Sequence, residues 1–424
     1  MIAPRGRGKR RIIGICFNVD GTGLTRVMRT VLGQLASDFD IAYLGIGYSG
    51  PLFDDGGVRM HPTNPRGGDV FAAFQALEMV RRDPPDVVFI LNDIWLFDNY
   101  RRVFEPVRDQ TKFVGYVPLD GTIVHEEIVL PLLWLDRVVV YTEWAAGQLC
   151  SAFARLGAAG HNGRLPQIEV VNHGVDTATF KPSPGLVAAA FDPRRRAGTK
   201  RRVFPTLDDP ENSFVVLNAS RPVIRKRVDT TIEAFALFAE AKPPDVRLCL
   251  HHAIAQEDTG ELLELAHTLG ISDRLAYNPL SPQGGALGED ELALLYSACD
   301  VGINTAMGEG WGLVAFEHAA TGAAQIVPRH SACGALWNDG VAQMIEPTDR
   351  AIPHFSPLEM ARVDAKAAAA AMEALYSDRN RLRYLSKAGY EHARRPELRW
   401  DSIAHRWRAI LTDVINEHVA GRHA

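Results

Sequence analysis

Two glutamates, Glu309 and Glu317, stand eight residues apart around a glycine-rich stretch that ends at Gly312. The surrounding apolar residues predict a short strand at 302–305 and a helix at 313–320. A strand, turn and helix in this order present backbone N–H groups and the positive end of a helix dipole at the carboxyl edge of a sheet. Such an edge binds anions. The pattern therefore predicts a diphosphate site, in which one carboxylate reaches a sugar and the other reaches a ribose diol.

The backbone of this turn is expected to provide much of the binding. Gly310 and Gly312 let a diphosphate approach the main chain closely, and Gly322 is a natural residue for ending the helix. Trp311 and Leu313 are expected to contribute backbone N–H groups, and the indole ring matters less. A pair of glutamates by itself is also typical of solvated or helix-capping side chains. The combination with the strand, the glycines and the helix favours a functional site.

A group of cationic side chains follows the apolar run at 213–217. Arg221 and Lys226 offer a bidentate guanidinium and a point-charge ammonium, which suit an anionic ligand such as a diphosphate. Arg225 and Arg227 stand in the same segment. The competing interpretation is therefore a solvated basic cluster ahead of the next helix.

The N-terminal half offers a second glycine-containing turn. Gly21 and Gly23 separate an apolar run at 12–17 from a stretch of helical spacing at 25–36. Such a turn would face the same ligand edge of a sheet. A tight strand-to-helix turn explains the two glycines almost as well.

Two aspartates follow predicted strands in the same half. Asp120 lies after the run at 112–117 and before Gly121, and it is the candidate for contacting the donor sugar or the acceptor hydroxyl. An Asp–Gly turn is an equally good interpretation, and a contribution from His125 stays open. Asp93 is a weaker candidate on the acceptor side, where an Asx turn is favoured.

Four other polar residues are assigned no catalytic role. Asp38 and Asp40 resemble a metal-binding Asp-x-Asp pair, but they precede the amino end of a strand, away from the ligand edge. No metal site is predicted there. His173 is interpreted as a structural residue between domains, and His318 as a packed helix residue.

Short, continuously apolar runs alternate with stretches of helical spacing through the N-terminal half. Such runs are typical of strands buried on both faces of a parallel sheet, and the alternation predicts a doubly wound α/β domain. The predicted strands are 12–17, 41–46, 87–91, 112–117 and 137–141, with a weaker sixth at 170–171, and the predicted helices include 25–36 and 70–81.

The pattern changes between 180 and 213. Residues 180–185 are turn-rich, and six basic residues lie within 194–202, which we interpret as linker and exposed loop. Strands and helices then alternate again from 213 to 327, which predicts a second α/β domain, and residues 367–422 are helical in pattern. Open α/β sheets bind ligands at the carboxyl ends of their strands, so a cleft between the two domains is the expected ligand site.

Length and composition agree with a two-domain globular protein. The chain has 424 residues and a net charge of -5, which gives no general attraction to nucleic acid. Its five cysteines show no metal-binding spacing and suggest reduced thiols in the cytoplasm. No apolar run reaches the length of about 18 residues that a membrane span needs. The basic runs at 5–11 and 194–202 are interpreted as solvated loops, with peripheral contact to an anionic membrane as the alternative.

The segment from Glu309 to Glu317, with Gly-Trp-Gly-Leu after the first glutamate, resembles the signature of retaining GT-B-fold glycosyltransferases of family 4, the glycosyl transferases group 1. Other segments resemble the family in the same order. They are the Gly21-Thr-Gly23 turn, Asn172-His-Gly-Val-Asp176, the segment from Asn218 to Lys226, and Trp400 in the last helical region. The family commonly has a histidine after the strand at 112–117, where this sequence has Tyr116-Val-Pro-Leu-Asp120.

The resemblance implies a GT-B fold, with two Rossmann-like domains facing each other across a cleft. It places an acceptor-side domain at 1–180, a donor-binding domain at 181–395, and a helix at 396–424 that packs back on the first domain. It also implies that Arg221 and Lys226, rather than their basic neighbours, bind the donor diphosphate.

By the same resemblance, the reaction moves a hexose-type sugar from a UDP- or GDP-sugar to an acceptor hydroxyl with retention of configuration. No metal and no cofactor are implied, and the acceptor is a glycan, a lipid or a small molecule. Two alternatives stay open. A sugar-nucleotide epimerase of the same fold would consume the donor without an acceptor. A non-catalytic partner of another transferase would bind the nucleotide sugar without turning it over.

Overall fold

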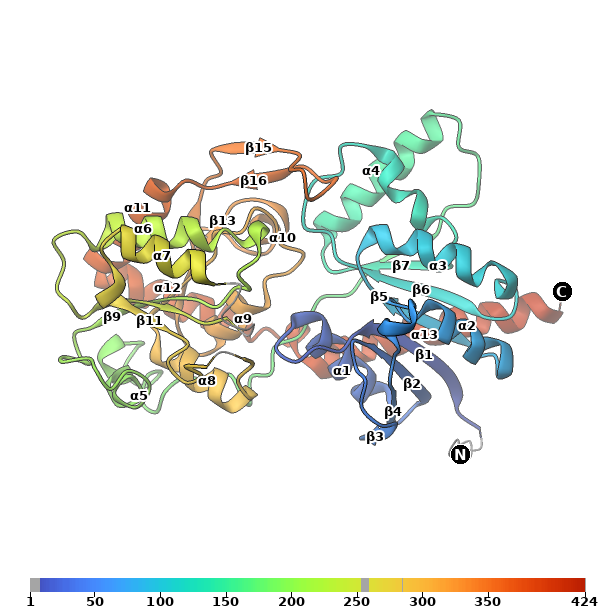
Figure 1. The fold of residues 1–424 in the computed structure, drawn as a ribbon, viewed down its shortest axis with the longest axis horizontal. Helices are drawn as coiled ribbons and strands as arrows, with labels where there is room; N and C mark the ends of the chain where they lie inside the picture. The colour runs from blue at the N-terminus through green and yellow to red at the C-terminus, as the bar shows by residue number, and fades with distance from the viewer. Residues whose placement is uncertain (1–7, 253–258, 284, 424) are drawn as a thin grey trace. The chain divides into compact units, whose positions relative to one another are not determined.

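The structure, a computed structural model, describes residues 8–252, 259–283 and 285–423, which divide into two compact units (Figure 1). The N-terminal unit extends to His173 and includes the last helix, which begins at Trp400. The C-terminal unit is Gly174–Arg399. The sequence placed these divisions at 180 and 395, a few residues away. Residues 5–7 of the predicted basic run lie outside the described residues.

An eight-stranded sheet forms the centre of the N-terminal unit, in the order β3-β4-β2-β1-β5-β6-β7-β8. Neighbouring strands are parallel except for the antiparallel β3–β4 pair. The strands are β1 (Arg10–Phe17), β2 (Phe39–Ile46), β3 (Phe53–Asp55), β4 (Val58–His61), β5 (Val87–Leu91), β6 (Lys112–Val117), β7 (Arg137–Val140) and β8 (Gln167–Val170). Every residue of β5 and β7 is buried, as expected for strands covered on both faces.

The last helix of the chain, α13, begins at Trp400 and packs on the N-terminal unit. Trp407 of α13 is fully buried, with its ring 4.6 Å from that of Phe89 and 4.8 Å from that of Tyr116. The α-helices are α1 (Gly23–Leu35), α2 (Ala73–Arg82), α3 (Phe97–Phe104), α4 (Glu143–Ala158) and α13 (Trp400–His423), with 3-10 turns η1 (Pro65–Gly67), η2 (Ile94–Leu96), η3 (Glu105–Val107) and η4 (Glu126–Leu132).

The C-terminal unit has a second parallel sheet, in the order β11-β10-β9-β12-β13-β14, and a separate antiparallel β15–β16 hairpin. The strands are β9 (Phe214–Asn218), β10 (Val246–Leu250), β11 (Leu275–Tyr277), β12 (Val301–Ile303), β13 (Ala324–Pro328), β14 (Gln343–Ile345), β15 (Asp349–Ala351) and β16 (Met360–Arg362). The α-helices are α5 (Ala197–Val203), α6 (Val228–Ala239), α7 (Gly260–Thr268), α8 (Glu289–Ala298), α9 (Leu313–Ala320), α10 (Ser331–Leu336), α11 (Ala365–Ser377) and α12 (Arg379–Ala393). The 3-10 turns are η5 (Pro193–Arg196), η6 (Ile224–Lys226), η8 (Ser272–Arg274) and η9 (Pro396–Leu398).

The prediction of an exposed basic loop at 194–202 is correct only in part, because Arg194, Arg195, Arg201 and Arg202 are exposed but the segment is not a loop. The segment forms η5 and α5, and Arg196 and Lys200 are buried. Lys200 Nζ lies 2.8 Å from a carboxylate oxygen of Asp300 and donates to the carbonyl of Ser213 at 2.9 Å. Arg196 donates to main-chain carbonyls from the α8 and α9 regions. The acceptors lie far away in the sequence, so composition alone suggested a solvated segment.

Two smaller predictions also need correction. The weak strand predicted at 170–171 is the four-residue β8, which ends at Val170. It lies at the edge of the sheet, and three of its four residues are partly or fully exposed, so it lacks a continuous apolar run. The helix predicted at 70–81 begins later, at Ala73, because Ala72 adopts a left-handed conformation with φ of 57°.

Candidate functional site

The loop between β12 and α9 contains Glu309. α9 covers Leu313–Ala320, the predicted bounds. Gly312, directly before it, has φ of 92°, a left-handed conformation that glycine adopts without steric cost. The first backbone N–H groups of a helix have no intrahelical acceptor, so this end of α9 is a donor for anions at the carboxyl edge of the sheet.

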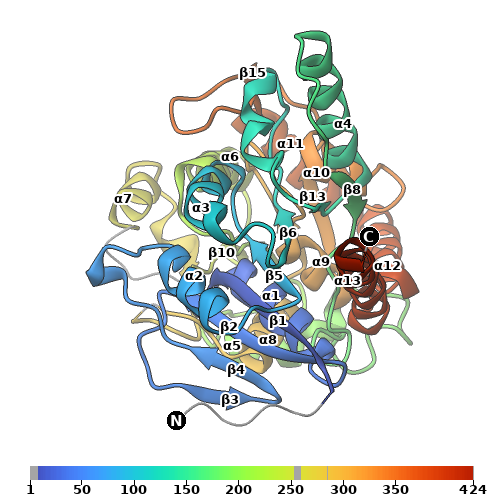
Figure 2. The same ribbon diagram turned by 90° about the vertical axis from the view of Figure 1, so that its right-hand side faces the viewer.

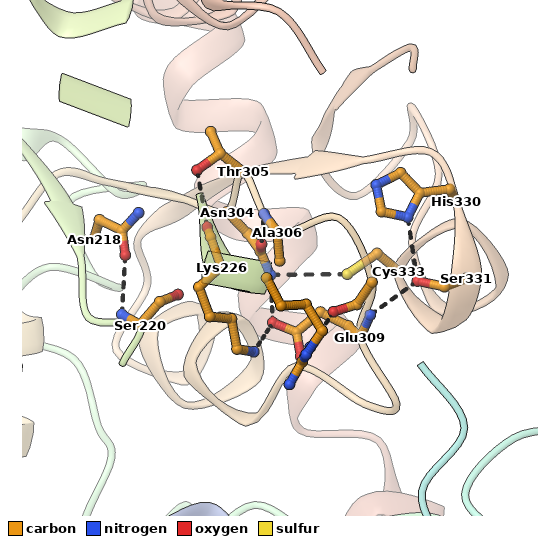
Figure 3. Close-up of polar contacts among 12 residues, drawn as sticks. Asn218, Ser220, Lys226, Asn304, Thr305, Ala306, Glu309, His330, Ser331 and Cys333 are labelled. Carbon is orange, nitrogen blue, oxygen red and sulfur yellow. Dashed lines mark hydrogen bonds and ion pairs between the residues drawn. The ribbon is translucent and has the colours of Figure 1, made fainter. Parts of the chain in front are cut away.

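The carboxylate of Glu309 is buried and multiply paired (Figure 3). Lys226 Nζ lies 2.5 Å from Oε1, and Asn304 Nδ2 donates to the same oxygen at 3.1 Å. The guanidinium of Arg225 lies 3.9 Å from Oε2 and also donates to the carbonyl of Gly308. The structure thus brings together Lys226 and Glu309, two of the residues that the sequence singled out.

Positive charge dominates the electrostatics of this cluster. Burial by itself would raise the pKa of Glu309, but the charges of Lys226 and Arg225 outweigh it and hold that pKa below its usual value. Burial lowers the pKa of Lys226 in spite of the adjacent carboxylate, and the charges of Arg225 and Arg221 lower it further. Arg221 is therefore close enough for its charge to act on Lys226. Lys226 and Arg225 beside one carboxylate, with the charge of Arg221 acting on Lys226, leave a surplus of positive potential for an anionic ligand.

A chain of hydroxyl groups holds the turn that contains Lys226. The next residue, Arg227, is left-handed with φ of 48°, a strained conformation of the kind that costs about 1–3 kcal/mol. Thr305 Oγ1 donates to the carbonyl of Arg227 at 2.7 Å. Because Thr305 has one hydroxyl proton, its 2.8 Å contact with Thr231 must use the Thr231 hydroxyl as donor, and Asn218 Nδ2 donates to Thr231 in turn at 2.8 Å. The turn is thereby tied to the carboxyl ends of β9 and β12.

A second strained residue holds Glu309 from the other side. Ser331, the first residue of α10, has φ of 47°. Its Oγ accepts the backbone N–H of Glu309 at 3.1 Å, and Ala332 N–H donates to the carbonyl of Glu309 at 3.1 Å. His330 contacts the Ser331 hydroxyl at 3.2 Å, and burial lowers the pKa of His330 to about 4, so its ring is neutral at pH 7 (Figure 3). The backbone of Glu309 is therefore fixed independently of its side chain.

The remaining predicted residues of this unit lie around the same loop. Gly310 and Trp311 connect Glu309 to the start of α9, and the Trp311 ring is buried and stacked on Phe316 at 5.0 Å. The indole therefore packs against α9, and the expected role of the Trp311 backbone N–H in ligand binding stays a prediction. Glu317 is buried in the second turn of α9.

Gly21, Gly23 and Asp120 belong to the N-terminal unit. Gly21 is left-handed with φ of 76°, and Gly23 is the first residue of α1, so both lie in the turn after β1. Asp120 follows the carboxyl end of β6 and is partly buried. These residues share the ligand edge of their sheet, since β1 and β6 are both parallel to β5.

The residues that received structural interpretations are engaged in packing or ion pairs. Asp38 lies 2.8 Å from Arg408 of α13, and Asp40 lies 2.7 Å from Arg59. Burial lowers the pKa of both His173 and His318 to about 3. The two histidines are confirmed as buried, packed residues.

Sequence reasoning missed several residues of the site. Asn304 and Thr305 directly follow β12, and Asn218 ends β9, so the rule that ligand-site residues follow strands could have found them. Arg225 was noted in the sequence, but Arg221 and Lys226 were favoured over it as ligands of the diphosphate. Ser331 gave no signal, because its contact with Glu309 depends on a left-handed backbone that the sequence does not reveal.

Comparison with known proteins bears on this site directly. Residues 199–392, which include the whole Lys226–Glu309 cluster, match the family described as glycosyl transferases group 1. These residues form a glycosyl transferases group 1 domain. The resemblance predicted from Glu309, Glu317 and the segment around Lys226 is thereby confirmed.

Proteins similar in sequence to this chain include two D-inositol 3-phosphate glycosyltransferases. The protein of Salinispora tropica is 28% identical over 291 residues, which cover 67% of this chain and 52% of that protein. The protein of Salinispora arenicola is 31% identical over 202 residues, which cover 44% of this chain and 38% of that protein. The matched region thus spans about half the length of these relatives, or less.

Solved structures resemble the group 1 domain together with the N-terminal unit. Sucrose-phosphate synthase from Thermosynechococcus elongatus has a TM-score of 0.71 at 16% identity, covering 96% of this chain and 100% of that chain. Anabaena Alr3699/HepE in complex with UDP and glucose has a TM-score of 0.68 at 15% identity, covering 95% and 100%. These likenesses confirm the predicted fold class, a GT-B architecture of two Rossmann-like units. Among the described residues, no helix combines the length and the apolar character that crossing a membrane requires.

Proposed function

We propose that this protein transfers a hexose from a nucleoside-diphosphate sugar to an acceptor hydroxyl, with retention of configuration and without a metal ion. The observation that supports the proposal most is the buried Lys226–Glu309 pair at the start of α9, with Arg221 and Arg225 close by. A cluster of this kind suits a diphosphate better than a neutral ligand, because two or more cations face one carboxylate. The names of the group 1 relatives agree with a transferase.

The cations would stabilise the departing diphosphate. As the bond between the anomeric carbon and the phosphate oxygen breaks, negative charge grows on the leaving group, and preorganised donors in a buried site lower the barrier. Lys226, Arg221 and the N–H groups at the start of α9 are such donors. The strained but firmly held turn at Arg227 keeps the ammonium in place without reorganisation during the reaction.

Retention of configuration would follow from attack on the face from which the diphosphate leaves. The acceptor oxygen forms the new bond to the anomeric carbon, and its proton passes to an oxygen of the departing diphosphate. The products are the glycosylated acceptor and the free nucleoside diphosphate. Glu309 would orient Lys226 and bind hydroxyls of the donor sugar, and Glu317 would bind the ribose.

The identity of the donor and the binding place of the acceptor are proposed on different grounds. UDP-sugars are the first donors to test, since the complexes of Alr3699/HepE contain UDP, glucose or UDP-glucose. GDP-sugars are the second. The acceptor would bind to the N-terminal unit, near Asp120 and the Gly21–Gly23 turn. We also propose a cytoplasmic setting, which agrees with five cysteines that form no disulfide.

The test is turnover of purified protein with UDP- and GDP-sugars, with and without an acceptor panel, in the presence and absence of a chelator. We expect release of nucleoside diphosphate that depends on the acceptor and survives chelation, and a product with the donor's anomeric configuration by NMR. Conversion of the donor sugar without an acceptor would indicate an epimerase instead. Tight binding of the nucleotide sugar with no reaction under any condition would indicate a non-catalytic partner.

A further inference from the structure

Exposed apolar side chains gather at one edge of the N-terminal unit. Among its described residues, eight large hydrophobic side chains are exposed, and seven of them follow the carboxyl ends of parallel strands. The seven are Val19 after β1, Leu52 after β2, Val70 and Phe74 after β4, Trp95 after β5, and Val124 and Leu130 after β6. We call these seven residues the apolar edge. The eighth, Leu165, lies before β8, at the opposite edge.

The loops of the apolar edge are joined to one another. The rings of Phe17 and Phe71 meet at 6.5 Å, which links the turn after β1 to the loop after β4. Tyr100 of α3 donates to the carbonyl of Phe71 at 3.0 Å, which links that loop to the helix after β5. Helices α2 and α3 contact each other, and η2 contacts η4. Figure 2 shows α2 and α3 side by side.

The exposure of the two aromatic residues is unusual for a surface without a ligand. Phe74 is 58% exposed in the first turn of α2, and Trp95 is 52% exposed in η2. Single exposed hydrophobic residues need no explanation, but concentrations of them mark binding surfaces. Here the concentration falls on the edge where an open α/β sheet binds its ligand.

Arginine side chains near the apolar edge form ion pairs within the unit. Arg101 and Arg102, in the helix after Trp95, both pair with Asp98, at 2.9 and 2.6 Å. Arg155 pairs with Glu126 at 3.3 Å. The arginines on α3 and the one beside η4 are therefore already engaged with carboxylates, although the two on α3 share one. An uncharged apolar group fits this surface better than the phosphates of an anionic membrane, which would require a basic patch.

We infer that the acceptor has an uncharged apolar group that binds to the apolar edge, principally against Phe74 and Trp95, beside the hydroxyl that receives the sugar. The inference rests on the proposed function, because it names the class of acceptor: an amphipathic molecule with a polar hydroxyl end and an alkyl or aryl end. Aromatic side chains suit this role, since they contribute large contact areas with little loss of conformational freedom.

The test compares octyl glucoside, below its micelle concentration, with methyl glucoside by isothermal titration calorimetry of the full chain. Burial of the octyl chain should give the octyl compound an affinity at least about tenfold higher. Phe74→Ser and Trp95→Ser should each reduce this preference by about threefold or more, and the double variant should remove it. Leu165→Ser is the matched control, because that residue is 44% exposed at the opposite edge, and it should leave the preference unchanged.

Equal affinities for the two glucosides, or a preference that survives the double variant, would overturn the inference. Co-sedimentation with neutral phosphatidylcholine vesicles provides a second arm. Vesicle binding that the same variants abolish, without a preference for octyl over methyl glucoside, would show that the edge contacts a bilayer and not an acceptor. A separate turnover assay tests the proposed function on its own. If the protein prefers octyl glucoside but consumes no nucleotide sugar, the proposed transferase is refuted. The binding of an apolar ligand at this edge would still be established.

Discussion

The carboxyl edges of the two sheets are built in different ways. At the edge of the C-terminal sheet, charged side chains are buried, paired with each other and fixed by hydrogen-bond chains, as at Lys226 and Glu309. At the edge of the N-terminal sheet, large apolar side chains such as Trp95 are exposed, and nearby charges pair locally. The same topology thus supplies a rigid electrostatic site on one sheet and an adaptable apolar surface on the other. This difference agrees with the proposed transferase, in which one ligand, the donor, is of a fixed type and the other, the acceptor, is of a different class.

The largest expected effect comes from removing charge at the C-terminal edge. Lys226→Met should lower kcat by about 10²–10³-fold, because a preorganised donor to the leaving group is lost. Donor KM should change less, and steady-state kinetics separate the two parameters. The double variant Lys226→Met/Glu309→Gln is the control for folding, because it removes both charges of the buried Lys226–Glu309 pair together. A kcat within twofold of the wild type in both variants would contradict the assigned role.

Glu317→Ala should act mainly on donor binding. Loss of a charge-assisted hydrogen bond to the ribose should raise donor KM by about tenfold or more, with a smaller change in kcat. The control is Glu264→Ala, a variant of the same type at an exposed position on α7 in the same unit, which should be silent. An unchanged KM for every accepted donor would rule out contact between Glu317 and the nucleotide.

The hydroxyl chain should have an intermediate effect. Thr305→Val removes the donor to the carbonyl of Arg227 while keeping the side-chain volume, so the turn with Lys226 loses its support. We expect kcat to fall by about tenfold with donor KM nearly unchanged, since the loss of one buried hydrogen bond costs about 1–3 kcal/mol. Thr305→Ser should restore activity. Equal losses in the valine and serine variants would indicate a packing role instead.

The smallest effect concerns stability and pH. The pKa of Glu309 is lower in the folded protein than its ordinary value of 4.5, so the carboxylate stabilises the fold above that value. This contribution should be lost as pH falls through the depressed pKa. The Tm difference between the wild type and Lys226→Met/Glu309→Gln should therefore be constant from about pH 7 to 5 and change by a few degrees below about pH 4. A difference that does not vary with pH would mean that Glu309 does not titrate in this range.

Local signals predicted the elements that position the site. β5 and β6 match their predicted bounds because each is a short, continuously apolar run, and α9 does so because glycines bracket it. The meeting of Lys226 with Glu309 was implied only by the family resemblance, since the two lie far apart in sequence.

The features that could not be predicted depend on contacts between segments that are distant in the sequence. The sequence predicted a solvated Lys200, because no local pattern shows that Lys200 forms a buried ion pair with Asp300. The hydroxyl chain and the strained backbone of Ser331 were hidden for the same reason: each depends on contacts between segments that are distant in sequence. The apolar edge was equally hidden, because its seven residues come from separate loops that only the sheet order brings to one side.

The most direct test of the central claim is calorimetric titration of the protein with UDP, GDP, ADP and dTDP. At least one nucleotide should bind, and Lys226→Met/Glu309→Gln should weaken its binding by about tenfold or more, while Leu165→Ser should bind it as the wild type does. Absence of binding to all four nucleotides, or equal affinity in the double variant, would contradict the assignment of this cluster as the diphosphate site.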